Sequence, residues 1–183
     1  MSNYIINILT DRKTLYTMVI RDFKSRYFSS FIGLPWAFIQ PAASIFVIWF
    51  AFTYGLKAGP TASGAPYAPW LIVALIPWMF ISQTLIVSCD AIPEYAYLVK
   101  NTKFNVSLIP IIKIFSGMIV HAILIICIVI LLLLFYGFTP SIYWIQIFYY
   151  LFALTVLLSG IALFVSSVNV FIKDMAHIVN IVV

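Results

Sequence analysis

The stretch RDFKSRYFSSFIGLPWAFIQP, residues 21–41, decides the fold, because a basic and aromatic segment leads through a glycine and a proline into an apolar run. Arg21, Lys24 and Arg26 precede the glycine, and three such cations would be costly to place in the hydrocarbon layer. The run that begins at Pro35 has too few polar residues for a water-exposed segment. The stretch therefore predicts a segment on a membrane surface followed at once by a membrane-spanning helix.

The composition of the whole chain supports a membrane protein. Of the 183 residues, 64% are hydrophobic and only 8% are charged, whereas ordinary soluble domains carry roughly 25% charged residues. A soluble fold with so few charges would expose large apolar patches. The net charge is +5, but the cations are spread over several loops and form no continuous face, so we expect no nucleic-acid partner.

Four apolar runs are long enough to cross the hydrocarbon layer, which takes about 20 helical residues. They cover residues 35–56, 70–89, 114–135 and 144–168, and a fifth run begins at Ile178 and meets the end of the sequence at Val183. We therefore expect an all-α integral membrane protein with an N-terminal interfacial helix, four transmembrane helices and the start of a fifth, and a sequence that is part of a longer chain. Residues 1–34 would form a cytoplasmic segment and residues 35–183 the transmembrane domain.

The basic residues alternate between the two sides of these spans. Lys57 alone lies in the loops of one side, and the other nine lie in the loops of the other side, namely Arg12, Lys13, Arg21, Lys24, Arg26, Lys100, Lys103, Lys113 and Lys173. Cytoplasmic loops carry the excess of lysine and arginine. The distribution predicts a cytoplasmic N-terminus.

The segment before the first span reads as an amphipathic helix. At 100° per residue one arc collects apolar residues and the opposite arc collects polar ones. The apolar arc holds Leu15, Met18, Val19, Ile20, Phe23 and Tyr27, and the polar arc holds Lys13, Thr17, Arg21 and Lys24. Such a helix lies along the inner membrane face. Its basic arc is either an anchor to anionic lipid or a docking surface for a cytoplasmic partner, and both roles are compatible.

The chain offers no chemistry of its own that would power transport or catalysis. It contains no G-x-x-x-x-G-K motif, which a P-loop nucleotide site requires. Asp90 and Glu94 stand without a base, a nucleophile or a metal-ligand set, so we expect solvated loop charges and predict no enzyme, no metal and no cofactor site. In the spans, Lys113 is expected to snorkel to the cytoplasmic surface and His121 to hydrogen-bond a neighbouring helix rather than relay protons.

The first two spans are better candidates for lining a transport path than the third. Residues 118–135 of the third span, MIVHAILIICIVILLLLF, are almost uniformly aliphatic and are expected to face lipid. The aromatic residues of the first span either pack in the core or against lipid, or form flat surfaces along which sugars slide. The path candidates are Trp36, Phe38, Gln40, Ser44, Trp49, Phe52 and Gln83.

Three motifs resemble one family, the permeases of ATP-binding-cassette polysaccharide exporters. SRYFSSFIGLPWAFIQP (25–41) resembles the family's motif at the first span, with a basic-Tyr pair, a Gly, a Leu-x-Trp and a closing Pro. EYAYLVKNTKFNVSLIPI (94–111) is similar to its first cytoplasmic coupling segment, and NVFIKDMAHIV (169–179) to its second. Family members have six spans, two of which would lie beyond or across the end of this sequence.

The resemblance implies a permease domain in the bacterial cytoplasmic (inner) membrane that moves a lipid-linked polysaccharide, such as O-antigen, capsule or teichoic acid, outward. Two copies would pair with two cytoplasmic ATPase subunits, which bind the ATP and Mg. The implied docking residues are Arg21, Lys24, Arg26, Glu94, Lys100, Lys103, Phe104, Phe171, Lys173 and Asp174. Two alternatives stay open: an ABC-type exporter of drugs or small lipids, and a non-transporting membrane scaffold of a glycan-synthesis complex.

Overall fold

The computed structural model describes residues 12–28, 33–61, 64, 66–101, 104–137 and 141–183. Within these ranges all regular structure is helical, which confirms the all-α prediction. The elements, in order, are α2 (Arg12–Phe28), α3 (Trp36–Phe50), the π-helix η1 (Ala51–Gly55), α4 (Tyr67–Cys89), α5 (Ala91–Glu94), α6 (Ala96–Asn101), α7 (Leu108–Phe135), the 3₁₀ helix η2 (Ile142–Ile145), α8 (Gln146–Phe171) and α9 (Met175–Val182).

Four helical segments are long and apolar enough to cross a membrane, as predicted. They run over Trp36–Gly55, Tyr67–Cys89, Leu108–Phe135 and Ile142–Phe171. The third begins at Leu108 rather than at residue 114, because Lys113, which interrupts the apolar run, is buried and paired inside the helix. The expected start of a fifth segment lies in α9, which begins at Met175.

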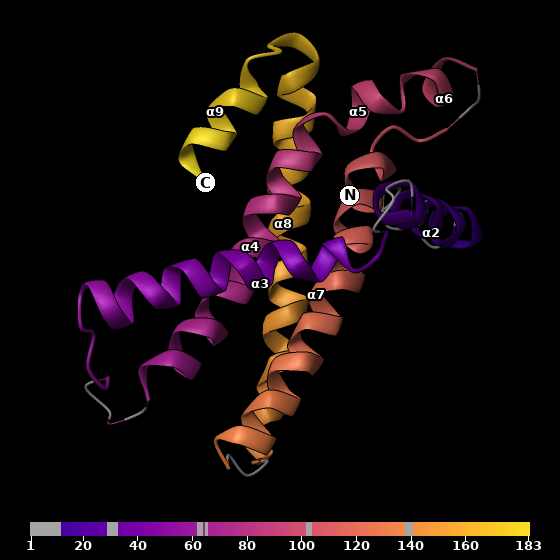
Figure 1. Ribbon diagram of the computed structural model, residues 1–183. Coiled ribbons are helices and arrows are strands. Elements are labelled where there is room, and N and C mark those ends of the chain that lie inside the picture. The colour runs from indigo at the N-terminus through magenta and orange to yellow at the C-terminus, as the bar shows by residue number, and fades with distance from the viewer. Residues whose placement is uncertain (1–11, 29–32, 62–63, 65, 102–103, 138–140) are drawn as a thin grey trace.

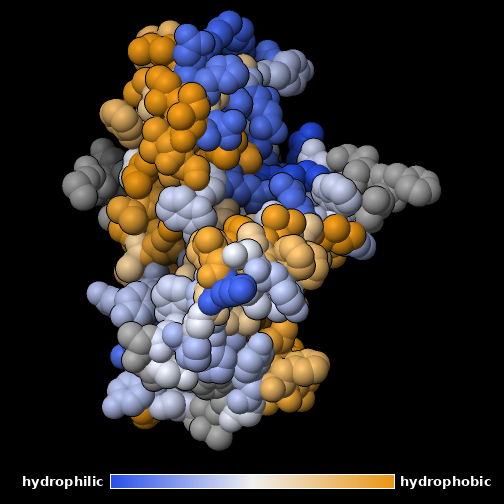
Figure 2. Space-filling model, turned by 60° about the vertical axis from the view of Figure 1, so that its left-hand side comes forward, coloured by the Kyte–Doolittle hydropathy of each residue, from blue (hydrophilic) through white to orange (hydrophobic). Residues whose placement is uncertain are grey.

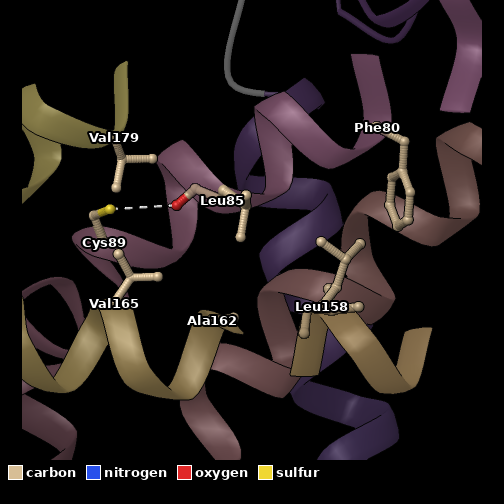
Figure 3. Close-up of a cluster of buried hydrophobic side chains, with 8 residues drawn as sticks. Phe80, Leu85, Cys89, Leu158, Ala162, Val165 and Val179 are labelled. Carbon is tan, nitrogen blue, oxygen red and sulfur yellow. Dashed lines mark hydrogen bonds between the residues drawn. The ribbon is translucent and has the colours of Figure 1, made fainter. Parts of the chain in front are cut away.

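The core lies where α4, α7 and α8 pack along one another (Figure 1). Its largest cluster combines side chains from α4, α7, α8 and α9, among them Phe80, Leu158 and Val179. Figure 3 shows Phe80 beside Leu158 at one end of this cluster and Val179 beside Cys89 at the other. The Cys89 thiol donates a hydrogen bond to the Leu85 carbonyl across 3.3 Å, so this buried thiol has its partner within α4. Gly117 permits the close approach of α7 to α4, since a Cβ there would lie 3.3 Å from both the Phe80 ring and Thr84 Oγ1.

The expectation that residues 118–135 face lipid is wrong at Val120, His121 and Ile128, which are buried, and the residues before this stretch are the most enclosed part of the helix. Buried residues run through α7 from Leu108 to Ile114 and include Val120 and His121 further along. Exposed residues dominate only toward its end, where Leu134 and Phe135 are largely open. An aliphatic sequence suits lipid and protein interiors equally well, so composition cannot tell which side of a helix is covered.

The two predicted arcs of α2 differ in burial, although Asp22 and Arg26 interrupt the apolar side. Every residue of its apolar arc is buried or partly buried, and every residue of its basic arc is exposed. The apolar arc packs against α7: Phe23 and Tyr27 share a cluster with Val120 and Leu124. Protein as well as lipid therefore covers this face.

The first span is the least enclosed of the four. Figure 1 shows α3 extending to the left, away from the line of α7 and α8. Ala37 is the one buried residue of α3, and η1 has none. Figure 2 shows broad hydrophobic patches on the face it presents, with most strongly hydrophilic residues in its upper half. This distribution suits helices surrounded by lipid.

Candidate functional site

A cluster of charged residues joins α2, α5 and α7 at the end of the bundle where α5 and α6 lie (Figure 1). Lys113 Nζ of α7 donates to Asp22 Oδ1 across 2.6 Å and to Glu94 Oε2 across 2.7 Å. The side chains of Lys113 and Asp22 are each 3% exposed, whereas that of Glu94 is 55% exposed. One buried cation thus holds one buried carboxylate and one that faces outward.

Two further residues complete this charge cluster. Arg26 Nη2 lies 3.1 Å from Asp22 Oδ2, one turn along α2. The Tyr95 hydroxyl donates to Asp22 Oδ1 across 3.1 Å, and Lys113 Nζ lies 5.1 Å from the centre of the Tyr95 ring, a distance typical of a cation–π contact. Two cations face two carboxylates, so the cluster of Asp22, Arg26, Glu94, Tyr95 and Lys113 is electrically balanced.

Burial and neighbouring charges determine the protonation of Asp22 and Tyr95 at neutral pH. Burial alone would raise the pKa of Asp22, but the hydrogen bond from Lys113 and the charge of Arg26 outweigh it and lower the pKa below its ordinary value of 3.8. Burial, together with the neighbouring Asp22 carboxylate, raises the pKa of the Tyr95 phenol. Asp22 is therefore an ionised acceptor and Tyr95 a neutral donor.

Asn169 forms a second polar junction at the same end of the bundle. Its side chain, in the last turns of α8, is buried. Its amide nitrogen donates to the Cys89 carbonyl across 3.0 Å and to Asp90 Oδ1 across 3.1 Å, while its amide oxygen accepts from the Ala176 backbone N–H across 3.3 Å. One side chain thereby ties the ends of α4 and α8 to the start of α9.

A cleft of about 300 Å³ lies beside this junction, between α5 and the turn that follows α8. Asp90, Pro93 and Ala96 line one side, and Asn169 and Lys173 line the other. The two loop segments singled out in the sequence, far apart along the chain, therefore border one surface depression.

The comparison with known families decides what kind of membrane protein this is. The family model described as ABC-2 type transporter matches residues 13–183, which include all of the elements from α3 to α9 and nearly all of α2. The chain belongs to the ABC-2 type transporter family. It is consequently a multi-pass membrane protein of a transporter family.

Two curated relatives of this ABC-2 chain share the same name. It is 26% identical over 168 residues to an O-antigen export system permease protein RfbA of Klebsiella pneumoniae, a match that covers 91% of the chain and 62% of the relative. It is also 26% identical over 172 residues to a protein of the same name from Myxococcus xanthus, covering 92% and 63% respectively. The chain thus spans less than two thirds of the length of the relatives it matches.

The ABC-2 chain presents most of the predicted docking residues at its surface. Arg21 and Lys24 are exposed on α2, Lys100 on α6, and Phe171, Lys173 and Asp174 at the turn after α8. Arg26 and Phe104 are partly buried, and Glu94 is exposed but bound to Lys113. Lys103 lies outside the described residues. The exposed members border the α5–α6 end from three separate elements.

The predicted path residues do not share one environment. Trp36, Gln40, Phe52 and Gln83 are exposed, whereas Phe38, Ser44 and Trp49 are partly buried. Phe38 packs against the cluster of Tyr27, Ala37 and Val120, so it is a packing residue here. The Trp49 ring belongs to a series of ring contacts, and its centroid lies 5.9 Å from those of both Phe46 and Tyr54.

Several expectations about polar residues are wrong. Lys113 does not snorkel, because two carboxylates neutralise it within the protein. Glu94 and Asp90 are not simply solvated, since Lys113 and Asn169 bind them. His121 is buried with its ring stacked on Phe80 at 4.5 Å, and its Nδ1 has no hydrogen-bond partner among the described residues.

The roles of Asp22, Tyr95 and Asn169 were not predicted from the sequence. A local signal existed for Asp22, an acidic residue that lies within the apolar arc of α2, between Val19 and Phe23. A matching signal existed for Lys113, a lysine within an otherwise apolar run. No local signal marks Tyr95 or Asn169, because their partners come from other helices.

Proposed function

We propose that this chain forms the membrane domain of a permease subunit in an ABC exporter that moves lipid-linked polysaccharide from the cytoplasm to the outer side of a bacterial inner membrane. The observation that carries the proposal is the match to two O-antigen export permeases over more than nine tenths of the chain. A separate subunit would hydrolyse the ATP and hold the Mg, and this chain would contribute no cofactor site.

The surface at the α5–α6 end supports the docking of such an ATPase. It presents exposed cations from α2 and α6, the exposed Phe171 ring, and a cleft between α5 and the turn after α8. Arginine and aromatic side chains around a depression are features of specific protein interfaces. Eight of the ten lysines and arginines lie outside the spanning helices on this side, and Lys113 lies near the start of α7, which supports a cytoplasmic location for this end and the N-terminus by the positive-inside rule.

The open surface of the first span supports assembly with a second copy. Little of α3 is enclosed within the chain, and the exposed Phe46, Phe50 and Tyr54 side chains lie next to one another. A path between two copies would let flat aromatic surfaces contact sugar rings without binding them tightly. The path candidates on α3 and Gln83 on α4 would then face the polymer.

Co-purification of the full-length protein tests the ATPase partnership. The tagged protein should bring a P-loop ATPase with it, and the double variant Arg21→Glu, Lys24→Glu should lose that partner, because like charges across an interface are repulsive. Lys57→Glu, at the opposite end of the bundle, is the matched control and should keep it. Equal recovery with all three proteins would contradict docking on α2.

Gene deletion tests the cargo. Cells without the protein should accumulate lipid-linked glycan inside and lose surface polymer. Normal surface polymer in the deletion strain would exclude polysaccharide as the cargo, and unchanged surface polymer with altered drug or lipid efflux would point to the exporter of small molecules instead.

A further inference from the structure

The two carboxylates that bind Lys113 are held very unequally. Asp22 is buried and also receives the charge of Arg26 and the hydroxyl of Tyr95. Glu94 is more than half exposed, and Lys113 is its one ion-pair partner among the residues that the structure describes. The cluster therefore has a fixed side on α2 and an exposed side on α5.

This inequality determines which contact opens more easily. Separating Lys113 from Asp22 would remove the shortest contact between two buried charges and leave the buried Lys113 with only the exposed Glu94 as its partner, which is costly. Separating Lys113 from Glu94 returns Glu94 to water and leaves Lys113 neutralised by Asp22, and an ion pair with one exposed member is already weakened by the solvent. The Glu94–Lys113 contact can open without leaving a buried charge unpaired.

The surroundings of Glu94 allow this contact to open at the Glu94 side chain. The helix α5 has only four residues, Ala91–Glu94, and both flanking residues leave helical geometry, Asp90 with φ −87° and ψ 4° and Tyr95 with φ −97° and ψ 14°. Tyr95 remains attached to Asp22 through its hydroxyl. Glu94 is the last residue of α5, and its exposed side chain can turn away from Lys113 while Ala91 stays buried and α2 stays on α7.

We propose that Lys113 is a positioning residue that seats Glu94, and with it the docking segment α5, against the unit formed by α2 and α7, and that the Glu94–Lys113 contact opens and closes once per transport cycle. The inference rests on the proposed function, since the movement of α5 would come from the ATPase. A single buried lysine, Lys113, would then transmit that movement into α7, whose first turns are buried.

The first test compares ATP hydrolysis with transport in the complete complex, permease and ATPase reconstituted together in vesicles. In Glu94→Gln the complex should assemble and hydrolyse ATP, while glycan moved per ATP falls by about tenfold, a typical coupling effect between two sites. Lys113→Arg, which keeps the charge, should retain most of the coupling. Lys57→Gln serves as the control that removes a charge at the opposite end.

The second test follows the contact directly by zero-length cross-linking. A carbodiimide joins a carboxylate to an amine that touches it, so it should form an amide between Glu94 and Lys113 in the nucleotide-free complex, identifiable by mass spectrometry and absent from Lys113→Arg. Trapping the ATPase with nucleotide and vanadate should reduce the yield by about tenfold. The same yield in both states would overturn the proposal.

The two tests separate this inference from the function on which it rests. If the wild-type protein binds no ATPase and exports no polymer, the proposed function fails. If the wild-type complex exports polymer but Glu94→Gln keeps the wild-type ratio of transport to hydrolysis, or loses both activities in the same proportion, Lys113 has only a structural role and the inference alone fails.

Discussion

The close approach of α7 to α4 at Gly117 makes a quantitative prediction about stability. Replacing this glycine by alanine would place a Cβ 3.3 Å from Phe80 Cε2 and 3.3 Å from Thr84 Oγ1, distances at which the aromatic ring and the hydroxyl must both move by a few tenths of an ångström. In a helix interior, alanine is otherwise preferred over glycine by about 0.5–1 kcal/mol. Overpacking a well-packed contact costs about 1–3 kcal/mol.

At Gly117 the gain in helix propensity and the cost of overpacking oppose each other. At Gly160 only the gain in helix propensity applies. Gly160 lies inside α8, and a Cβ there would meet nothing within 4 Å. Gly160→Ala should therefore raise the free energy of unfolding by up to about 1 kcal/mol, whereas Gly117→Ala should be neutral or lower it by up to about 2 kcal/mol. The free energy of unfolding of the two variants should differ by roughly 1–3 kcal/mol.

Reversible unfolding of the full-length protein in mixed micelles, followed by helical circular dichroism, would measure this difference. Gly117→Leu extends the series, because a larger side chain must separate α4 from α7 and should lower stability further. Equal stabilisation by alanine at both positions would refute the reasoning, since it would mean that α4 and α7 do not approach closely at Gly117.

Two further predictions concern the polar junctions. Asn169→Ala removes hydrogen bonds to Cys89, Asp90 and Ala176 and should lower the free energy of unfolding by about 1–3 kcal/mol, with earlier proteolysis between α8 and α9; unchanged proteolysis would contradict a clamp at this position. Because the folded-state pKa of Asp22 is lowered, its contribution to stability is present above its ordinary pKa of 3.8 and is lost as the pH falls through the folded-state value. The stability difference between the wild type and Asp22→Asn should therefore stay constant from about pH 8 to about pH 5 and shrink below pH 3.8; a difference that already shrinks between pH 8 and pH 5 would contradict it.

Much of the fold follows from local properties of the sequence. The spanning helices were predicted because hydrophobic length is a property of consecutive residues, and the apolar arc of α2 was predicted because helical periodicity assigns each residue to a face. The lipid-facing assignment of residues 118–135 failed at Val120, His121 and Ile128, because an apolar run contains no information about which neighbour covers it. The polar residues Lys113, Ser116 and His121, which are buried in α7, were the local indication that part of this helix packs against other helices.

The sequence by itself determined that this chain enters a membrane, that four of the described helical segments are long enough to cross it, and which face of the N-terminal helix is apolar. Only the tertiary structure decided that Lys113 meets Asp22, 91 positions earlier in the chain, and that Asn169 reaches Cys89, 80 positions away. The physical reason is that hydrophobicity acts within each helix, whereas an ion pair or a side-chain hydrogen bond exists only where packing brings its two members within about 3 Å.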